Sequence, residues 1–243
     1  MMYFYIFILT KTTTMNRRNL YLHVIFILIV IVELLGRLLD NIYMEYPVKP
    51  LIMIWIAVYL WMNTKKNAVR KFALVAFFFS WVGDILLMFS GGYGNEMFFY
   101  AGVGGFFFAQ LSYIVLFLRN SENDIKGLLR RNPLLFIPLL AYGVFIYWLL
   151  FPKLEGIMVS IILVYATSLI GMSLAALNRR DRVGKLSFRL VFLGSLFFVA
   201  SDSMIAVNKF HTEIPQSGFL IMLTYIVAQY LIMRGLILEK ERK

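Results

Sequence analysis

Two aspartates are notable because each lies inside a long apolar run. Asp84 is within FFFSWVGDILLMF, and Asp202 is within FFVASDSMIAVNKF. An acid at the centre of a membrane helix costs about 2.5–3.5 kcal/mol on insertion scales, so such residues mark functional sites or buried polar partners. Two carboxyl groups held close together in a poorly hydrated site can serve one reaction as proton donor and proton acceptor. The pattern therefore raises acid–base chemistry within a membrane as a hypothesis.

The composition describes the surroundings of these acids. Of the 243 residues, 61% are apolar and 17% are aromatic, which predicts an integral membrane protein. The excess of basic residues lies in short gaps between apolar runs, and this argues against a nucleic-acid-binding face. The sequence has no cysteine and only two histidines, so we expect neither a metal nor a cofactor.

Apolar runs long enough to cross about 30 Å of hydrocarbon predict the fold class. We expect an all-α, polytopic membrane protein with about eight transmembrane helices. The expected spans are residues 20–39, 48–62, 72–89, 97–118, 133–151, 156–177, 187–207 and 218–238.

The domain organisation follows from these spans. Residues 20–238 are expected to form a single eight-helix domain, and 239–243 a basic cytoplasmic tail. Residues 1–19 are expected to be a flexible N-terminal extension. Met15 precedes Asn16 and two arginines and is a second candidate start, so residues 1–14 are treated as an extension.

Charge predicts the orientation in the membrane. With eight spans, 20 of the 24 Lys and Arg residues fall on one side, and only four fall on the other. The positive-inside rule then places both termini in the cytoplasm. In a bacterium, the membrane would be the plasma (inner) membrane.

This topology gives the two aspartates the same depth. Each lies about 8 Å from the outer end of an outgoing span, at 1.5 Å per residue. Several polar residues are predicted near that level: Glu33, Arg37, Asp40, Lys49, Gln110, Tyr165, Asn208, Lys209, Tyr225 and Gln229. Glu33 and Arg37 are one turn apart, which favours a structural ion pair.

Structural roles remain open for each of these positions. Asp84 or Asp202 could be a buried hydrogen-bond acceptor or a partner of Lys49. The tyrosines and glutamines could join helices as readily as they could contact a substrate, and Lys209 could extend towards the membrane surface. The residues expected to allow close helix packing are Gly102, Gly104, Gly105, Gly171 and Gly194.

Five short blocks together resemble the YhhN family of lysoplasmalogenase-like membrane proteins. They are K-P-L at Lys49–Leu51, G-D-x-L-L at Gly83–Leu87, G-x-F-x-x-A-Q-x-x-Y ending at Tyr113, S-D-S-x-x-A-x-N-K-F at Ser201–Phe210 and T-Y-x-x-A-Q-Y-L-I at Thr224–Ile232. The resemblance extends over essentially residues 20–238. The two aspartate blocks are its most specific part.

The resemblance implies hydrolysis of the vinyl-ether bond of lysoplasmalogen, which releases a fatty aldehyde and a glycerophospho-base. It also implies that Asp84 and Asp202 are the catalytic pair. One departure is visible, because Gln110 stands where the resemblance leads us to expect histidine. An amide does not titrate, so Gln110 cannot transfer protons.

Substrate contacts are predicted around this pair. Lys49 and Lys209 would pair with the phosphate of a lysophospholipid, and Asn208 and Tyr225 would orient a hydroxyl group or water. The full set of expected substrate-binding residues is Lys49, Asn208, Lys209, Tyr165, Tyr225, Gln110 and Gln229. The apolar space between helices would hold the single chain. The partners are then this lipid and the bilayer, with no nucleic acid.

Other functions compete with this hypothesis. A proton-coupled transporter would also bury paired acids, although neither a half-length repeat nor paired Gly/Pro-broken helices are visible. A noncatalytic lipid-binding protein would tolerate loss of either aspartate. An intramembrane aspartyl protease is disfavoured, because residues 81–84 read Trp-Val-Gly-Asp and not G-x-G-D.

Overall fold

The computed structural model describes residues 17–93, 96–119 and 127–240 and is all-α over these ranges. Its helices are α2 (Arg17–Leu38), α3 (Ile42–Asn63), α4 (Ala68–Tyr93), α5 (Glu96–Arg119), α6 (Leu128–Arg131), α7 (Ile137–Leu150), α8 (Met158–Leu177), α9 (Lys185–Phe210) and α10 (Ser217–Lys240). Two short 3₁₀ helices, η1 (Pro133–Phe136) and η2 (Phe151–Lys153), flank α7. The expected start at Met15 and the last residues of the tail lie outside the described residues.

Seven helical segments in the described ranges are long and apolar enough to cross a membrane. They are α2, α4, α5, α8, α9, α10 and the continuous η1–α7–η2 segment. The eighth long helix, α3, has 22 residues, contains Glu45, Lys49 and two prolines, and is not among these seven. The prediction of an all-α, multi-pass membrane protein is confirmed.

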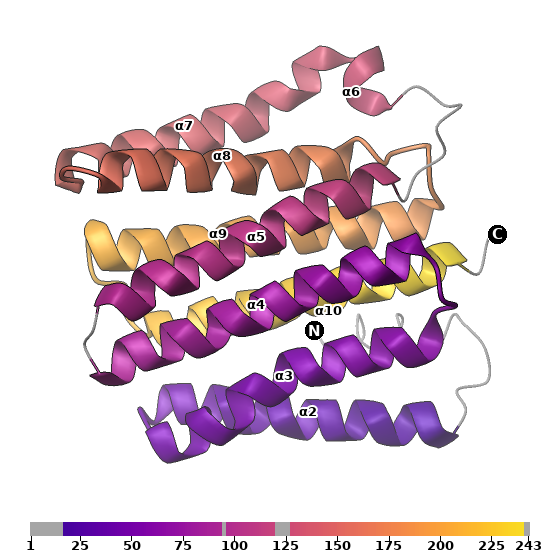
Figure 1. The fold of residues 1–243 in the computed structure, drawn as a ribbon, viewed down its shortest axis with the longest axis horizontal. Coiled ribbons are helices and arrows are strands. Elements are labelled where there is room, and N and C mark those ends of the chain that lie inside the picture. Colours follow the sequence, from indigo (N-terminus) through magenta and orange to yellow (C-terminus); the bar gives the residue numbers. More distant parts are fainter. Residues whose placement is uncertain (1–16, 94–95, 120–126, 241–243) are drawn as a thin grey trace.

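The long helices run alternately in opposite directions, side by side (Figure 1). The first turn of α2 and the last turn of α10 lie at the same end of the bundle (Figure 1). The turns between α3 and α4 and between α8 and α9 lie at that end too, and they hold many of the basic residues. By the charge rule, this end is predicted to face the cytoplasm.

Most of the long helices form a closed ring. In the order α2, α3, α4, α5, α8, α9 and α10, each helix contacts the next, and α10 contacts α2 again. Within the α10 span 72% of the residues are buried, whereas only 6% are buried in the span that includes α7. The α7 helix contacts α8 and α9 at the edge of the bundle (Figure 1). The core therefore lies between the ring helices.

Several helix boundaries differ from the expected spans. The α3 helix begins at Ile42 and not near residue 48, because a tight turn precedes it: Asp40 adopts φ 49°, and the Asn41 side chain accepts a hydrogen bond from Tyr43 N at 3.0 Å. Residues 17–19 belong to α2, and residues 239–240 belong to α10. Apolar runs alone could not show these polar helix ends.

Glycines allow two pairs of helices to approach closely, as predicted. A Cβ at Gly105 would lie 2.9 Å from the backbone N of Gly83, and a Cβ at Gly194 would lie 2.8 Å from the carbonyl O of Ala228. The prediction was wrong for Gly104, where a Cβ would meet no atom within 4 Å. The helix repeat of about 100° per residue turns Gly104 away from the α4 face that Gly105 occupies.

We expect Gly105→Val to lower the stability of the fold while Gly104→Val leaves it near the parent value. Valine at position 105 must push α4 and α5 apart, at a cost of about 1–3 kcal/mol. The melting temperature of each purified variant is measured in detergent, with fluorescence-detected gel filtration as the readout of folded protein. Equal melting temperatures for the two variants would contradict the packing described for these neighbours.

Candidate functional site

Asp84 and Asp202 line the same cavity, although they come from different helices, α4 and α9. The cavity has a volume of about 120 Å³ and is also lined by Arg37, Lys49 and Tyr225. Asp84 and Asp202 are each only 4% exposed. A cavity of this size can hold several water molecules or a few heavy atoms of a ligand.

Asp202 is held by two neutral donors from two further helices. Its Oδ2 accepts a hydrogen bond from the Tyr165 hydroxyl on α8 at 2.5 Å and another from Gln110 Nε2 on α5 at 3.1 Å. The Gln110 Oε1 in turn accepts a hydrogen bond from Ser168, one turn after Tyr165. This chain of contacts fixes the Gln110 amide with its NH₂ group towards the acid.

Asp84 is held in a similar way by one donor. Its Oδ2 accepts a hydrogen bond from the Tyr225 hydroxyl on α10 at 2.7 Å. Over the described ranges, the Oδ1 atoms of Asp84 and Asp202 accept no hydrogen bond from the protein, and both side chains line the cavity. The Oδ1 atoms are therefore the carboxylate oxygens that a bound molecule could reach.

A further set of hydrogen bonds lies one helical turn before Asp84 on α4. Gln229, one turn after Tyr225, donates from Nε2 to Ser80 Oγ at 3.1 Å, and its Oε1 accepts a hydrogen bond from the Tyr113 hydroxyl. Gln229, Ser80 and Tyr113 are fully buried. These contacts join α4, α5 and α10, and on α4 and α10 they lie one helical turn away from residues that line the cavity.

Two basic residues line the cavity, and they differ in their partners. Arg37 forms ion pairs with Glu33 Oε1 at 3.2 Å and with Glu45 Oε2 at 2.8 Å. The predicted ion pair of Glu33 with Arg37 is thus confirmed, and Glu45 extends it across the turn between α2 and α3. Lys49 is only 7% exposed, and no described residue forms a hydrogen bond or ion pair with its ammonium group.

Two of the predicted substrate contacts lie apart from this cavity. Asn208 Oδ1 accepts a hydrogen bond from Ile214 N at 2.9 Å, which holds the loop after α9. Lys209 lies 3.7 Å from Glu96 and over the ring of Phe99, with 41% of its side chain exposed. Their contact with a substrate stays a prediction, whereas Lys49, Gln110, Tyr165, Tyr225 and Gln229 lie at the cavity or in its hydrogen-bonded surroundings.

Sequence reasoning missed several members of the network. These are Ser80, Tyr113 and Ser168. A signal was present, because each is three or four residues from a residue that was identified: Ser80 from Asp84, Tyr113 from Gln110 and Ser168 from Tyr165. Polar residues repeated at this spacing lie on one helix face.

A metal site was not expected. Within the described ranges, no three His, Asp or Glu side chains are grouped as ligands for a metal ion. The absence of a metal remains a prediction. The chemistry that the cavity offers comes from carboxyl, phenol, amide and ammonium groups.

The fold and the cavity together define a class: an all-α, multi-pass membrane protein with a buried pair of acids enclosed by a ring of helices. The chain belongs to the YhhN family, which it matches over residues 44–236. The match extends from the beginning of α3 into the last turns of α10 and includes both aspartates. The resemblance seen in the sequence motifs is confirmed.

One human protein is similar to part of the chain. The chain is 36% identical over 99 residues to lysoplasmalogenase TMEM86A of Homo sapiens, across 39% of this chain and 41% of the human protein. The alignment therefore covers less than half of either protein. No solved structure matches the chain.

We expect Gln229→Leu to destabilise the fold by about 1–3 kcal/mol, because it removes the hydrogen-bond partner of two buried groups, the Tyr113 hydroxyl and Ser80 Oγ. Thr224→Val is the matched control on α10, since the Thr224 hydroxyl bonds only carbonyls of its own helix. Thermal unfolding in detergent compares the two variants. Adding Tyr113→Phe and Ser80→Ala to Gln229→Leu should recover part of the loss; a further loss instead would contradict this account.

Proposed function

We propose that this protein is a membrane hydrolase that cleaves the vinyl-ether bond of a lysoplasmalogen, a 1-alkenyl lysophospholipid. The observation that carries the proposal is the pair Asp84 and Asp202, which line one small buried cavity. Membership of the YhhN family and the partial similarity to a human lysoplasmalogenase support it. If the host is a bacterium, the protein would act in the inner membrane.

The reaction requires one proton donor and one proton acceptor. A carboxylic acid protonates the alkenyl carbon that does not bear oxygen, and the C=C electron pair forms the new C–H bond. The remaining oxocarbenium ion is attacked by water, whose proton passes to a carboxylate. The hemiacetal then collapses to a fatty aldehyde and a free glycerol hydroxyl. The sum is the addition of one water, with no net change in the protonation of the protein.

The arrangement of Asp84 and Asp202 suits this sequence of steps. Two carboxyl groups flank the bond in glycoside hydrolysis, which also passes through an oxocarbenium-like ion. Here the hydrogen bonds to Oδ2 from Tyr225 and from Tyr165 hold each carboxyl group in place. The Oδ1 atoms remain for the alkenyl carbon and for water. We describe the acids as one coupled pair and assign the first proton to neither alone.

The cavity also offers a partner for the phosphate of the substrate. Arg37 is neutralised by Glu33 and Glu45, whereas Lys49 has no anionic partner within ion-pairing distance in the described structure. A buried ammonium group without a partner is costly, and a phosphate would relieve that cost. Lys49 is therefore the basic residue that we assign to the headgroup.

A proton-coupled transporter and a noncatalytic lipid-binding protein are the alternatives. Both could bury Asp84 and Asp202, but neither requires a covalent bond to break. Release of aldehyde by the purified protein separates the hydrolase from both of them.

We expect Asp84→Asn and Asp202→Asn each to reduce aldehyde release from a 1-alkenyl lysophospholipid by roughly 10²–10⁴-fold, because each removes a group that transfers a proton. Asp181→Asn is the matched control. Asp181 is an exposed aspartate that pairs with Arg131 at 2.7 Å far from the cavity. The assay compares purified proteins in detergent at equal amounts of folded protein.

The outcomes of this assay are distinct. Loss of activity in both cavity variants, with Asp181→Asn near the parent rate, supports the catalytic pair. An inert parent protein would overturn the proposed hydrolysis. An active parent with one active cavity variant would leave the hydrolase but reject the two-carboxyl mechanism.

We expect Lys49→Met to abolish the preference for a phosphate-bearing substrate. The assay compares the kcat/KM values for a 1-alkenyl lysophospholipid and for the 1-alkenylglycerol that lacks phosphate. A charge-assisted contact is worth about 1.5–3 kcal/mol, so the ratio should fall by roughly tenfold or more in Lys49→Met. Lys209→Met should retain the ratio, because Lys209 is partly exposed and near Glu96. If only Lys209→Met lost the preference for the phosphate-bearing substrate, the phosphate would be assigned to Lys209, near the end of α9, and not to Lys49.

A further inference from the structure

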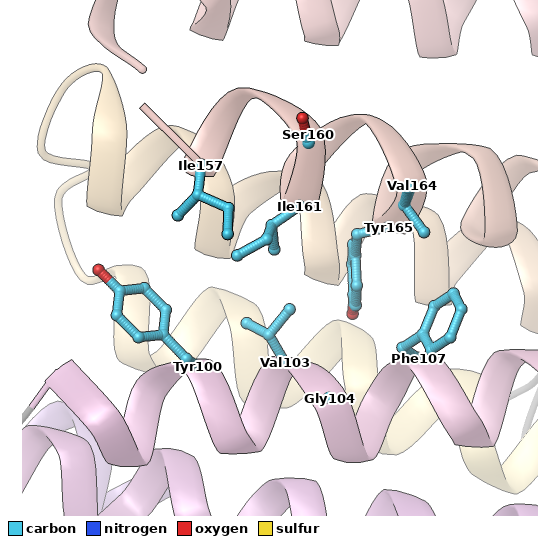
Figure 2. A pocket seen from close by; sticks show the side chains of 9 residues that line it. All are labelled: Tyr100, Val103, Gly104, Phe107, Ile157, Ser160, Ile161, Val164 and Tyr165. Atoms are coloured by element: carbon cyan, nitrogen blue, oxygen red, sulfur yellow. The ribbon is translucent and has the colours of Figure 1, made fainter. Parts of the chain in front are cut away.

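A large apolar groove lies between α5 and α8, outside the acid cavity. Its volume is about 460 Å³, and its lining includes Val103, Gly104 and Phe107 from α5 and Ile161 and Tyr165 from α8. Figure 2 shows Val103 and Phe107 facing Ile161 and Tyr165 across the groove. Gly104 forms part of the floor, where a Cβ would meet no atom within 4 Å. The absence of a side chain at Gly104 thus leaves the groove open.

One hydrogen bond joins the groove to the acid cavity. Tyr165 lines the groove, and its hydroxyl donates to Oδ2 of Asp202, which lines the cavity. The Tyr165 ring presents an apolar surface to the groove while its hydroxyl contacts the acid. Tyr165 therefore contacts both the apolar groove and the polar cavity's acid.

The sizes of the two spaces are complementary. Ligand pockets in proteins usually have volumes of about 300–1,000 Å³. The acid cavity, at about 120 Å³, is too small for a long hydrocarbon chain. The remainder of a long substrate has to lie elsewhere, and the groove has the volume and the apolar lining that a hydrocarbon chain needs.

A second apolar groove provides a comparison. It lies between α7 and α8, has a volume of about 350 Å³ and is lined by residues that include Val144, Thr167 and Leu174. Within the described structure, no residue lining it forms a hydrogen bond with Asp84 or Asp202. The two grooves are similar in polarity, but only the groove between α5 and α8 adjoins an acid.

We propose that the groove between α5 and α8 receives the hydrocarbon chain of the single-chain lipid, with Tyr165 between the chain and the acid pair. This inference rests on the proposed function. The polar end of the lipid lies on the side of Arg37 and Lys49, the bond to be cleaved lies at Asp84 and Asp202, and the chain passes Tyr165 towards the bilayer. The lipid would then cross the ring from the α2–α3 side to the α5–α8 side.

The first test uses chain length. Gly104→Leu places a branched side chain in open space, so the fold should persist while the groove shortens. We expect at least a tenfold lower kcat/KM for long-chain 1-alkenyl lysophospholipids and less than a twofold change for short-chain ones. Thr167→Leu, in the groove between α7 and α8, should leave both values unchanged. The same loss at both chain lengths in Gly104→Leu would overturn the inference.

The second test measures thiol modification and so does not depend on activity. The sequence contains no cysteine, so an introduced thiol is the only one that can react. Gly104→Cys and Thr167→Cys each introduce a single thiol, and the rate of modification by an alkyl methanethiosulfonate is measured in detergent. A 1-alkyl lysophospholipid, whose saturated ether cannot be hydrolysed by this route, should slow modification at position 104 at least fivefold and leave position 167 unaffected. A diacyl phospholipid should protect neither position.

Together the tests separate this inference from the proposed function. An active parent in which Gly104→Leu keeps the parental chain-length profile retains the hydrolase and rejects the groove. An inert parent in which the lyso-ether lipid still protects position 104 rejects hydrolysis and retains the chain site. Protection of position 104 by the diacyl lipid as well would identify ordinary bilayer lipid as the occupant and overturn the inference.

Discussion

The hydrogen-bonding requirement of polar groups buried among apolar helices is the constraint on which this structure depends. Away from water, each such group is costly unless it finds a partner. Asp202 is bonded from α5 and α8, and Asp84 is bonded from α10. Because every one of these bonds joins different helices, satisfying them fixes both the depth and the rotation of the helices around the cavity. The polar network thus determines the geometry of the core that glycine contacts and apolar packing then complete.

That network also bears on the acid–base chemistry proposed for the two aspartates. In each aspartate a single carboxylate oxygen receives the protein donors, which leaves the other oxygen for a molecule bound in the cavity. The donors belong to tyrosine and glutamine side chains, which are neutral, so they orient the carboxyl groups without neutralising them. Arg37 lines the cavity too, but its ion pairs are with Glu33 and Glu45. The cavity consequently keeps two carboxyl groups available for proton transfer.

The sequence predicts much of this arrangement, and the limits of that prediction have physical causes. The common depth of Asp84 and Asp202 follows from the fixed rise of a helix. Their rotation does not, because it depends on partners far along the chain, such as Gln110, 92 residues before Asp202. Asn208 also accepts a hydrogen bond from Ile214 N in the following loop, a contact that the sequence could not predict because loop geometry leaves no trace in hydrophobic periodicity. Gly104 was assigned to close packing because residue type alone cannot show which helix face it occupies.

The division between a polar cavity and an apolar groove has an energetic consequence for a lipid substrate. In water, burying a methylene group would contribute about 0.8 kcal/mol. A chain that moves from the bilayer into the α5–α8 groove leaves one apolar medium for another and gains far less. Under the proposed function, the groove would therefore select by shape, by admitting one chain of limited length. Under the proposed function, affinity and orientation would come from the polar end, where Lys49 and the two aspartates line a cavity too small for the hydrocarbon chain.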